Sequence, residues 1–285
     1  FIQYKADNFT AKVGRQVITL DDHRFVGHVG WRQDRQTFDA VSAKYAASEN
    51  LSLFYSYLYK RNRIFAEAAD LDSNDHILHA TYTSKIGKFV GYAYLLEIDS
   101  DTDNALDTYG VSYDGKTKGE KVNWAYGAEF ATQSSESGAG ETATDFDASY
   151  LNAYLAASFS GVTAKVDYEI LGSDDGQYGF STPLATLHKF NGWTDQFLGT
   201  PAQGLKDLKF SLSGGLAGGK WLLAYHDFTA DDSSNGVDDL GSEINVQYTK
   251  KFAGKYNFGI KYGTYDAGDI KVDANRFWMW VGTRF

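Results

Sequence analysis

Apolar and polar residues alternate with a period of two along most of this chain of 285 residues. In VTAKVDYEI, residues 162–170, the apolar side chains share one parity, while Thr163, Lys165, Asp167 and Glu169 share the other. Successive side chains of a strand point to opposite faces, so such a segment predicts a strand with one apolar and one polar side. VNWAYGAEF, EINVQY and YNFGIKYGTY repeat the pattern. The chain is therefore predicted to be all-β.

About fifteen segments have this character. They lie at residues 1–7, 9–18, 38–47, 50–62, 75–86, 88–99, 106–115, 120–133, 145–160, 162–172, 205–216, 219–230, 242–252, 255–266 and 274–285. Short connections such as KIGK and FAGK alternate with long ones at 19–37, 63–74, 100–105, 134–144, 173–204, 231–241 and 267–273. Short turns at one end and long loops at the other are typical of outer-membrane barrels.

The polar parity is rich in Gly, Ser, Thr, Asn and charge, and the other parity is rich in Tyr, Trp and Phe. Aromatic side chains suit the membrane interface, and an all-β span leaves no unpaired edge in lipid when its sheet closes. The pattern favours a transmembrane antiparallel up-and-down β-barrel. The alternative is a soluble sandwich or propeller, which would bury its apolar faces inside the protein.

The last ten residues, RFWMWVGTRF, fit a final membrane strand. Alternate residues from Phe277 to Thr283 would face lipid, while Arg276 and Arg284 share the opposite, luminal parity. The terminal Phe285 resembles the C-terminal signal of bacterial outer-membrane proteins.

Strand number and direction lead to an expectation about the start of the chain. Single-chain bacterial barrels have an even number of strands and both termini in the periplasm. Fifteen is odd, and strand 1–7 would begin at the extracellular rim. We therefore expect residues 1–285 to form one barrel domain that lacks at least one N-terminal strand, with 16–18 strands or more in the intact barrel.

Composition narrows the function classes. A net charge of −10 argues against a nucleic-acid binder, which needs a basic face. The absence of cysteine excludes disulfides and thiol–metal sites, and it fits an oxidising compartment. No apolar run approaches the roughly 18 residues of a spanning helix.

Two acidic stretches invite a metal interpretation. DLDSND (70–75) and DSDTDN (99–104) alternate acids with other residues, but both lack the glycine and glutamate of an EF-hand. A solvated acidic rim, bridged to lipopolysaccharide by divalent ions, is favoured over a calcium site. His76 and His79 face opposite sides of one strand, so no metal site is predicted. No cofactor motif or nucleophile elbow is present, so no enzyme is expected; a Ser–His lipid hydrolase is a distant rival.

Selectivity in a porin comes from the charges that line its lumen. By parity, the luminal side chains are Lys12, Lys44, Lys60, Lys165, Lys209, Lys261, Arg276, Arg284, Glu129, Asp167, Glu169 and Glu243. The long loop 19–37 adds Arg24, Arg32 and Arg35. Arg15 falls on the lipid parity unless a bulge at Gly14 shifts the register. This mixed but cation-leaning set favours an anion-preferring pore, although the charges could instead pair off structurally.

The loop 173–204 is unusually long for a segment without a function. It holds both prolines and three large aromatics in its second half, so we expect it to fold into the lumen or over the mouth of the barrel as a constriction or lid. A plug without solute contact is the alternative. The side chains expected on the solute path are His188, Lys189, Asn191, Trp193 and Asp195.

Two stretches resemble motifs of the bacterial alginate-export porin family. These are KVGRQVITLDDHRFVGHVGWRQDRQTFDAV (12–41) and HKFNGWTDQFLGTPAQGLKDL (188–208). The resemblance implies a monomeric outer-membrane barrel of about eighteen strands, some relatives of which secrete the polyanion alginate. It also implies that strands precede the Gly-Arg-Gln motif and that Arg15 lies inside the pore.

Together these observations predict a passive porin or export channel of the bacterial outer membrane for anionic or carbohydrate-like solutes. The expected surroundings are membrane lipid and lipopolysaccharide, with no nucleic acid and with room for a protein partner on either side. The alternative is a structural barrel that anchors a surface assembly or another protein.

Overall fold

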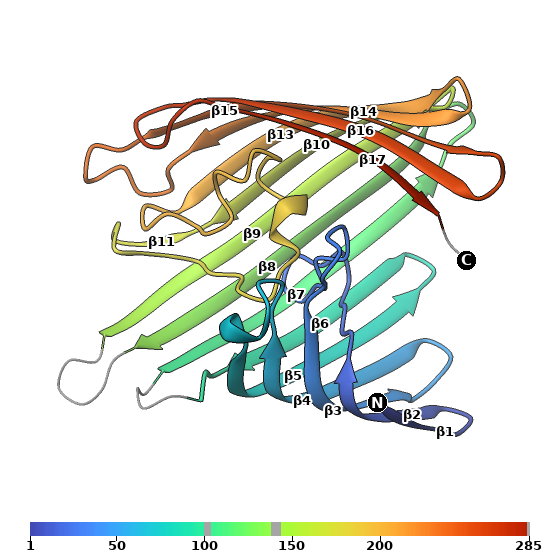
Figure 1. Cartoon of the computed structure of the whole chain (residues 1–285), viewed down its shortest axis with the longest axis vertical. Helices are drawn as coiled ribbons and strands as arrows, with labels where there is room; N and C mark the ends of the chain where they lie inside the picture. Colours follow the sequence, from blue (N-terminus) through green and yellow to red (C-terminus); the bar gives the residue numbers. More distant parts are fainter. Residues whose placement is uncertain (100–103, 138–143, 284–285) are drawn as a thin grey trace. The chain divides into compact units, whose positions relative to one another are not determined.

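The computed structural model describes residues 1–99, 104–137 and 144–283, and most of them are β-strand. Fifteen strands form one antiparallel sheet in which each strand pairs with the next along the chain (Figure 1). The strands are β1 (Ile2–Lys5), β2 (Phe9–Gln16), β3 (Thr37–Ala46), β4 (Leu51–Asn62), β5 (Leu71–Ser84), β6 (Gly87–Leu96), β7 (Asn104–Lys118), β8 (Asn123–Ser137), β9 (Thr144–Phe159), β10 (Val162–Leu171), β13 (Leu205–Leu216), β14 (Gly219–Thr229), β15 (Asp239–Phe252), β16 (Tyr256–Asp266) and β17 (Ala274–Thr283). The predicted all-β meander is confirmed.

Smaller elements lie in the long connections. The 3₁₀ turn η1 (Glu67–Ala69) precedes β5. A two-stranded ribbon, β11 (Ser173–Asp174) with β12 (Tyr178–Gly179), and the turn η3 (Leu187–Lys189) lie between β10 and β13. No helix among the described residues is long and apolar enough to cross a membrane.

The first acidic stretch was wrongly expected to be a loop. Residues 71–75 form the start of β5, where Asp72 pairs in register with Lys60 and Leu71 with Arg61. The second stretch falls mainly on residues 100–103, which lie outside the described residues. Among residues 1–99, 104–137 and 144–283, no group of three or more His, Cys, Asp or Glu side chains is placed to hold a metal ion.

The chain divides into two compact units, and each is described by itself. Unit 1 comprises residues 1–114, 129–150 and 180–187, and unit 2 comprises residues 115–128, 151–179 and 188–285.

Within each unit, one side of the strands, here called the inner face, is covered by chain segments. In unit 1 the segment 17–36 covers it, and Phe25 packs there against Tyr92, Tyr94 and Tyr150 at 5.2–5.9 Å between ring centroids. In unit 2 the segment 188–204 covers it, and Phe197 lies 4.9 Å from the ring of Phe228.

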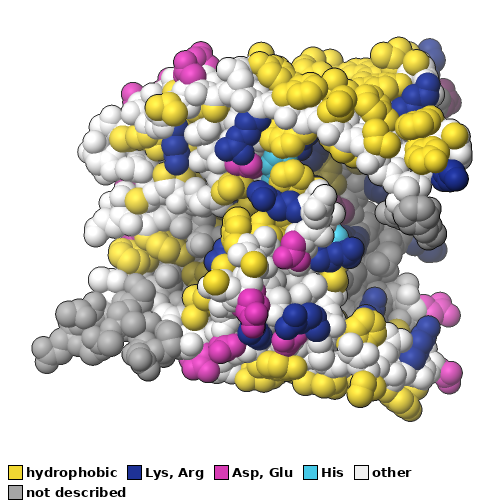
Figure 2. Space-filling view, viewed as in Figure 1, with side chains coloured by type: hydrophobic (Ala, Val, Ile, Leu, Met, Phe, Trp, Pro, Cys, Tyr) yellow, Lys and Arg dark blue, Asp and Glu magenta, His cyan; other side chains and the backbone are white. Residues whose placement is uncertain are grey.

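The opposite, outer face carries exposed large apolar side chains. In unit 2, Leu223 and Ile244 are 42% and 44% exposed, whereas His226 and Glu243 on the inner face are 2% and 1% exposed. Figure 2 shows hydrophobic side chains gathered on the outside of strands β14–β17, at the top of the view. The alternation in the sequence therefore separates a polar, covered face from an apolar, uncovered one.

A bulge in β4 corrects the predicted position of Lys60. Ala40 pairs with Leu58, but Asp39 pairs with Lys60, so Tyr59 is the extra residue. Lys60 therefore joins the outer face, beside Asp39, instead of the inner face. The same shift turns Arg61 inward, where it is 5% exposed.

Candidate functional site

A cavity of about 390 Å³ lies on the inner face of unit 1, between β2–β5 and residues 17–21. Lys12 and Lys44 line it from β2 and β3 together with hydroxyl side chains and Phe54. Thr10 pairs in register with Lys44, and Lys12 pairs with Ser42, so the two lysines are diagonal neighbours on one face. Neither lysine belongs to an ion pair within the part of the chain that the structure describes. Both lysine side chains thus line the same cavity, and the Lys12 ammonium also lies 5.1 Å from the ring centroid of Phe1.

Asp21 closes one side of this cavity. Its carboxylate accepts a hydrogen bond from Lys88 Nζ at 3.0 Å, and it pairs with His79 Nε2 at 2.7 Å. Burial by itself would raise the pKa of Asp21, but the hydrogen bonds and charges of His79 and Lys88 outweigh burial and hold that pKa below its usual range. Asp21 therefore fastens the segment 17–36 to β5 and β6 as an ionised group.

We expect acid to loosen this attachment. The pKa of Asp21 is lower in the folded protein than in the unfolded chain. The ionised carboxylate therefore stabilises the attached segment fully above the ordinary carboxyl pKa of about 4. This stabilisation is lost as the pH falls through the lower, folded-state pKa. Amide hydrogen exchange of residues 17–36, corrected for the intrinsic rate, should therefore rise steeply as the pH is lowered below about pH 4. Asp21→Asn should abolish this rise, whereas Asp34→Asn, at an exposed position of the same segment, should keep it. An unchanged rise in Asp21→Asn would contradict this role.

The rest of segment 17–36 is held by buried polar contacts. Gln36 Nε2 donates to the carbonyl oxygens of Gly27, at 2.9 Å, and Leu184, at 3.1 Å. Arg24 is 3% exposed, donates to Thr182 Oγ1 at 3.3 Å and lies over the ring of Tyr150. Arg24 is therefore part of the packed interior of unit 1 and is not open to a passage.

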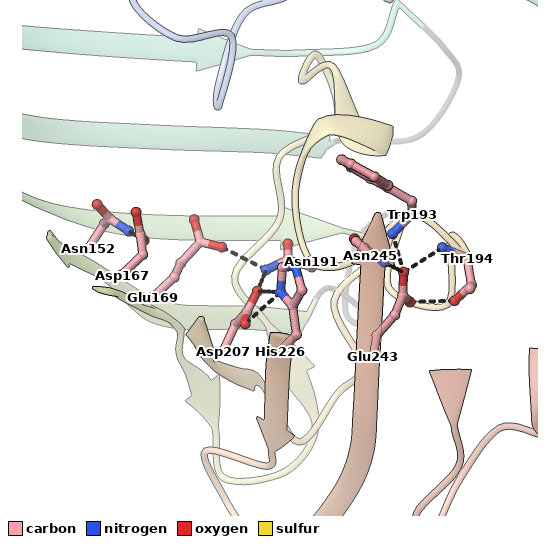
Figure 3. Close-up of polar contacts among 10 residues, drawn as sticks. All are labelled: Asn152, Asp167, Glu169, Asn191, Trp193, Thr194, Asp207, His226, Glu243 and Asn245. Atoms are coloured by element: carbon pink, nitrogen blue, oxygen red, sulfur yellow. Dashed lines mark hydrogen bonds and ion pairs between the residues drawn. The ribbon is translucent and has the colours of Figure 1, made fainter. Parts of the chain in front are cut away.

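In unit 2 the segment 188–195 is fastened by acids of the inner face (Figure 3). Asn191 Nδ2 donates to Glu169 Oε2 at 2.7 Å and to Asp207 Oδ2 at 3.1 Å. Asp207 also pairs with His226 Nδ1 at 2.9 Å. Further along β10, Asp167 accepts from Asn152 Nδ2 at 2.7 Å and forms an ion pair with Lys165. These carboxylates already have protein partners.

Glu243 is the deepest of these acids, with 1% of its surface exposed. Its carboxylate accepts hydrogen bonds from the backbone N–H groups of Trp193 and Thr194 and from Thr194 Oγ1, the last at 2.5 Å. Gly192 has φ +85°, and a Cβ there would lie 2.4 Å from Glu243 Oε2, so glycine is required for this approach.

Five predicted site residues meet in one cluster beside this anchor. His188 Nδ1 lies 2.5 Å from Asp195 Oδ1, and His188 Nε2 lies 2.6 Å from Lys261 Nζ. Arg276 Nη1 donates to Asp195 Oδ2 at 2.5 Å. The ammonium of Lys261 also lies 4.4 Å from the ring of Trp193. Lys261 and Arg276, two of the cations predicted to line the lumen, thus bind side chains of the segment 188–195.

Other predicted residues are placed separately. Glu129 accepts from Tyr92 Oη at 2.8 Å in unit 1. Arg32 lies over the Trp31 ring and Lys189 over the Phe190 ring, while Arg35 is exposed and Lys209 is half-buried on β13. Arg284 lies outside the described residues.

Arg15 requires a correction. Its side chain is 60% exposed and pairs with Asp39 on the outer face, on the same parity as Val13. The β2–β3 register runs unbroken through Gly14, so no bulge turns Arg15 inward. The placement inside the pore that the resemblance implied is therefore not supported, and the simple alternation gave the right face.

Several residues of the site were missed from sequence. Asp207 and His226 had a weak signal, since each is a polar residue on the inner parity of a predicted strand. Asp21, Lys88 and Thr194 had none, because their partners lie 49–67 residues away in the chain.

A family model described as alginate export matches residues 1–157. Among solved structures, the outer-membrane protein OpdK of Pseudomonas aeruginosa has a TM-score of 0.75 at 13% identity, over 98% of this chain and 77% of that chain. OccAB1 of Acinetobacter baumannii has a TM-score of 0.74 at 15% identity, over 98% and 74%. OccK5 (OpdH) of P. aeruginosa has a TM-score of 0.71 at 13% identity, over 98% and 80%. No curated protein matches the chain.

The family match covers more than half of the chain, and the structural matches show the fold of outer-membrane β-barrel porins. The apolar outer face and polar inner face of each unit agree with that fold. The chain belongs to the alginate-export family and is a porin-like β-barrel channel of the bacterial outer membrane.

Proposed function

We propose that this channel passes anionic, carbohydrate-like solutes by passive diffusion. The observation that carries the proposal is the cavity of about 390 Å³ in unit 1, which Lys12 and Lys44 line beside hydroxyl side chains. Two neighbouring ammonium groups attract carboxylates, and hydroxyls and the ring of Phe54 suit a sugar, whose C–H faces are apolar. The structure of the similar protein OpdK with vanillate agrees with passage of a small carboxylate through this fold.

The two units differ in the cations they offer to a solute. In unit 2, Lys165, Lys261 and Arg276 are engaged with Asp167, His188 and Asp195. A cation paired with a carboxylate attracts an anion less, because the two charges cancel at a distance. Lys12 and Lys44 keep their charge available, so we assign selectivity to unit 1 and the narrowing of the passage to the fastened segment 188–197.

The test is the reversal potential of the purified channel in planar bilayers under a salt gradient. We expect the wild type to prefer anions, and oligouronates to reduce its current. A unit charge at 4 Å contributes about 1 kcal/mol even in bulk water, so Lys12→Gln with Lys44→Gln should lower the anion-to-cation permeability ratio several-fold. Lys85→Gln, at a short turn of unit 1, serves as the control. Cation preference in the wild type, without block by oligouronates, would refute the proposal.

A structural role is favoured by one observation, the packed cluster of Phe25, Tyr92, Tyr94, Tyr150 and Phe180 on the inner face of unit 1. An interior filled in this way would suit a barrel that anchors a surface assembly. Conductance separates the two functions, because such an anchor would carry no current at any voltage in the bilayer.

A further inference from the structure

The outer face of unit 2 carries a groove of about 480 Å³. Its floor includes the small side chains Ala157 and Ala164, and its walls include Trp124, Phe210 and Leu223. The large side chains stand on neighbouring strands, so the two alanines leave a hollow between them. The lining side chains that face outward are apolar, so water is a poor occupant of this hollow.

The groove lies near the short turns. Ala157 and Ala164 flank the turn at residues 160–161, where Ser158 Oγ and Thr163 Oγ1 are 2.8 Å apart. Along β14, the outward residues beyond Leu223 are Trp221 and then Gly219, which pairs in register with Lys250. Four residues of strand separate Leu223 from that pair, a distance of about 13 Å.

Trp221 pairs in register with Tyr248, between the groove and Lys250. Aromatic rings of this kind occupy the headgroup level of a membrane. The outer face thus runs in order from an apolar groove to an aromatic pair to a cation, which matches the order of acyl chain, glycerol and phosphate in a phospholipid.

The short-turn end of unit 2 is strongly basic. Seven lysines lie within or beside its turns, and Glu120 is the one acid there: Lys116, Lys118, Lys121, Lys220, Lys250, Lys251 and Lys255. None of these lysines joins an ion pair among residues 1–99, 104–137 and 144–283. Short turns of outer-membrane barrels face the periplasm, so this charge meets the headgroups of the periplasmic leaflet.

We propose that unit 2 binds an anionic phospholipid of the periplasmic leaflet. One acyl chain would occupy the groove between Trp124 and Leu223, and the phosphate would lie at the lysine rim, with Lys250 as its nearest cation. Charge complementarity selects an anionic headgroup over a zwitterionic one, because unpaired lysines attract net negative charge. This site is independent of the solute that crosses the channel.

Native mass spectrometry of the whole chain, released from detergent with defined phospholipids, tests the site. We expect phosphatidylglycerol to be retained several-fold more than phosphatidylcholine of the same chains. Ala164→Phe should fill the groove and reduce retention of both lipids, whereas Ala43→Phe, on the outer face of unit 1, should not. Lys121→Gln with Lys250→Gln should remove the preference for phosphatidylglycerol and leave retention of phosphatidylcholine unchanged.

A second measurement, fluorescence quenching, does not require the Ala164→Phe substitution. Phospholipids with brominated acyl chains should quench Trp124, and the quenched fraction should fall in Trp124→Phe. Brominated phosphatidylglycerol should quench at a lower molar fraction than brominated phosphatidylcholine.

Equal retention and equal quenching with the two lipids would overturn the proposal. So would a dimer of the chain that forms without lipid and is lost in Ala164→Phe, because a second copy would then be the occupant. Unchanged retention in a correctly folded Ala164→Phe variant would likewise exclude the groove as the binding site.

Discussion

Replacing Glu243 with alanine is expected to release the segment 188–197 from the inner face of unit 2. The substitution would remove the acceptor of four donors: the N–H groups of Trp193 and Thr194, the Thr194 hydroxyl and the Asn245 side-chain amide. Each buried donor left unsatisfied costs about 1–3 kcal/mol. A loss of about 3 kcal/mol changes the ratio of attached to released segment by about a hundredfold.

Cleavage by trypsin after Lys189, with the protein in detergent, measures this release. The rate should rise in Glu243→Ala in proportion to the released population, because cleavage follows the open fraction when opening is fast. Single-channel conductance should also rise and fluctuate more if the segment narrows the passage as proposed. The cleavage result does not depend on that second assumption.

The matched control is Glu243→Gln, which keeps the side-chain size and one carbonyl oxygen. That oxygen can still accept from the backbone N–H groups, so this variant should lie between the wild type and Glu243→Ala. A cleavage rate in Glu243→Ala equal to that of the wild type would show that the contacts of Asn191 and His188 hold the segment without Glu243.

Replacing Arg61 with alanine should be the most destabilising single change in unit 1. The Arg61 guanidinium donates to both oxygens of Asp75, at 2.8 and 2.6 Å, and the side chains are 6% and 0% exposed. Removing one partner of a buried ion pair leaves an uncompensated charge and costs about 3–5 kcal/mol. The midpoint of urea unfolding, followed by the mobility shift of the folded barrel on gels, should fall accordingly.

Arg15→Ala is the natural comparison, because Arg15 makes the same two-point contact with Asp39 at an exposed site. Arg15 lies at the long-loop end of β2, where water reaches and screens the pair, so its loss should change the midpoint little. The double variant Arg61→Met with Asp75→Asn should recover part of the stability, since it removes both buried charges. A midpoint for Arg61→Ala no lower than that for Arg15→Ala would contradict this account.

The amino-acid sequence by itself determined the fold class and the faces of the strands. Alternation is a local property, and side chains in a strand point to opposite sides wherever the strand lies. Segment 162–170 therefore revealed both its strand and the inward position of Asp167 and Glu169, and the same alternation placed Arg15 outward. The motif at 12–41, which lies within the residues that the family model matches, likewise indicated the family.

Tertiary structure decided where alternation breaks and which charges remain available. Because of the bulge at Tyr59, Arg61 instead of Lys60 lies on the inner face. The amino-acid composition of a strand does not show where a single extra residue is inserted. Pairing of Lys261, His188 and Asp195 joins residues up to 73 positions apart, whereas neither Lys12 nor Lys44 forms an ion pair among the residues that the structure describes. Both outcomes depend on which distant segments fold against the strand, and that arrangement follows from packing of the whole chain.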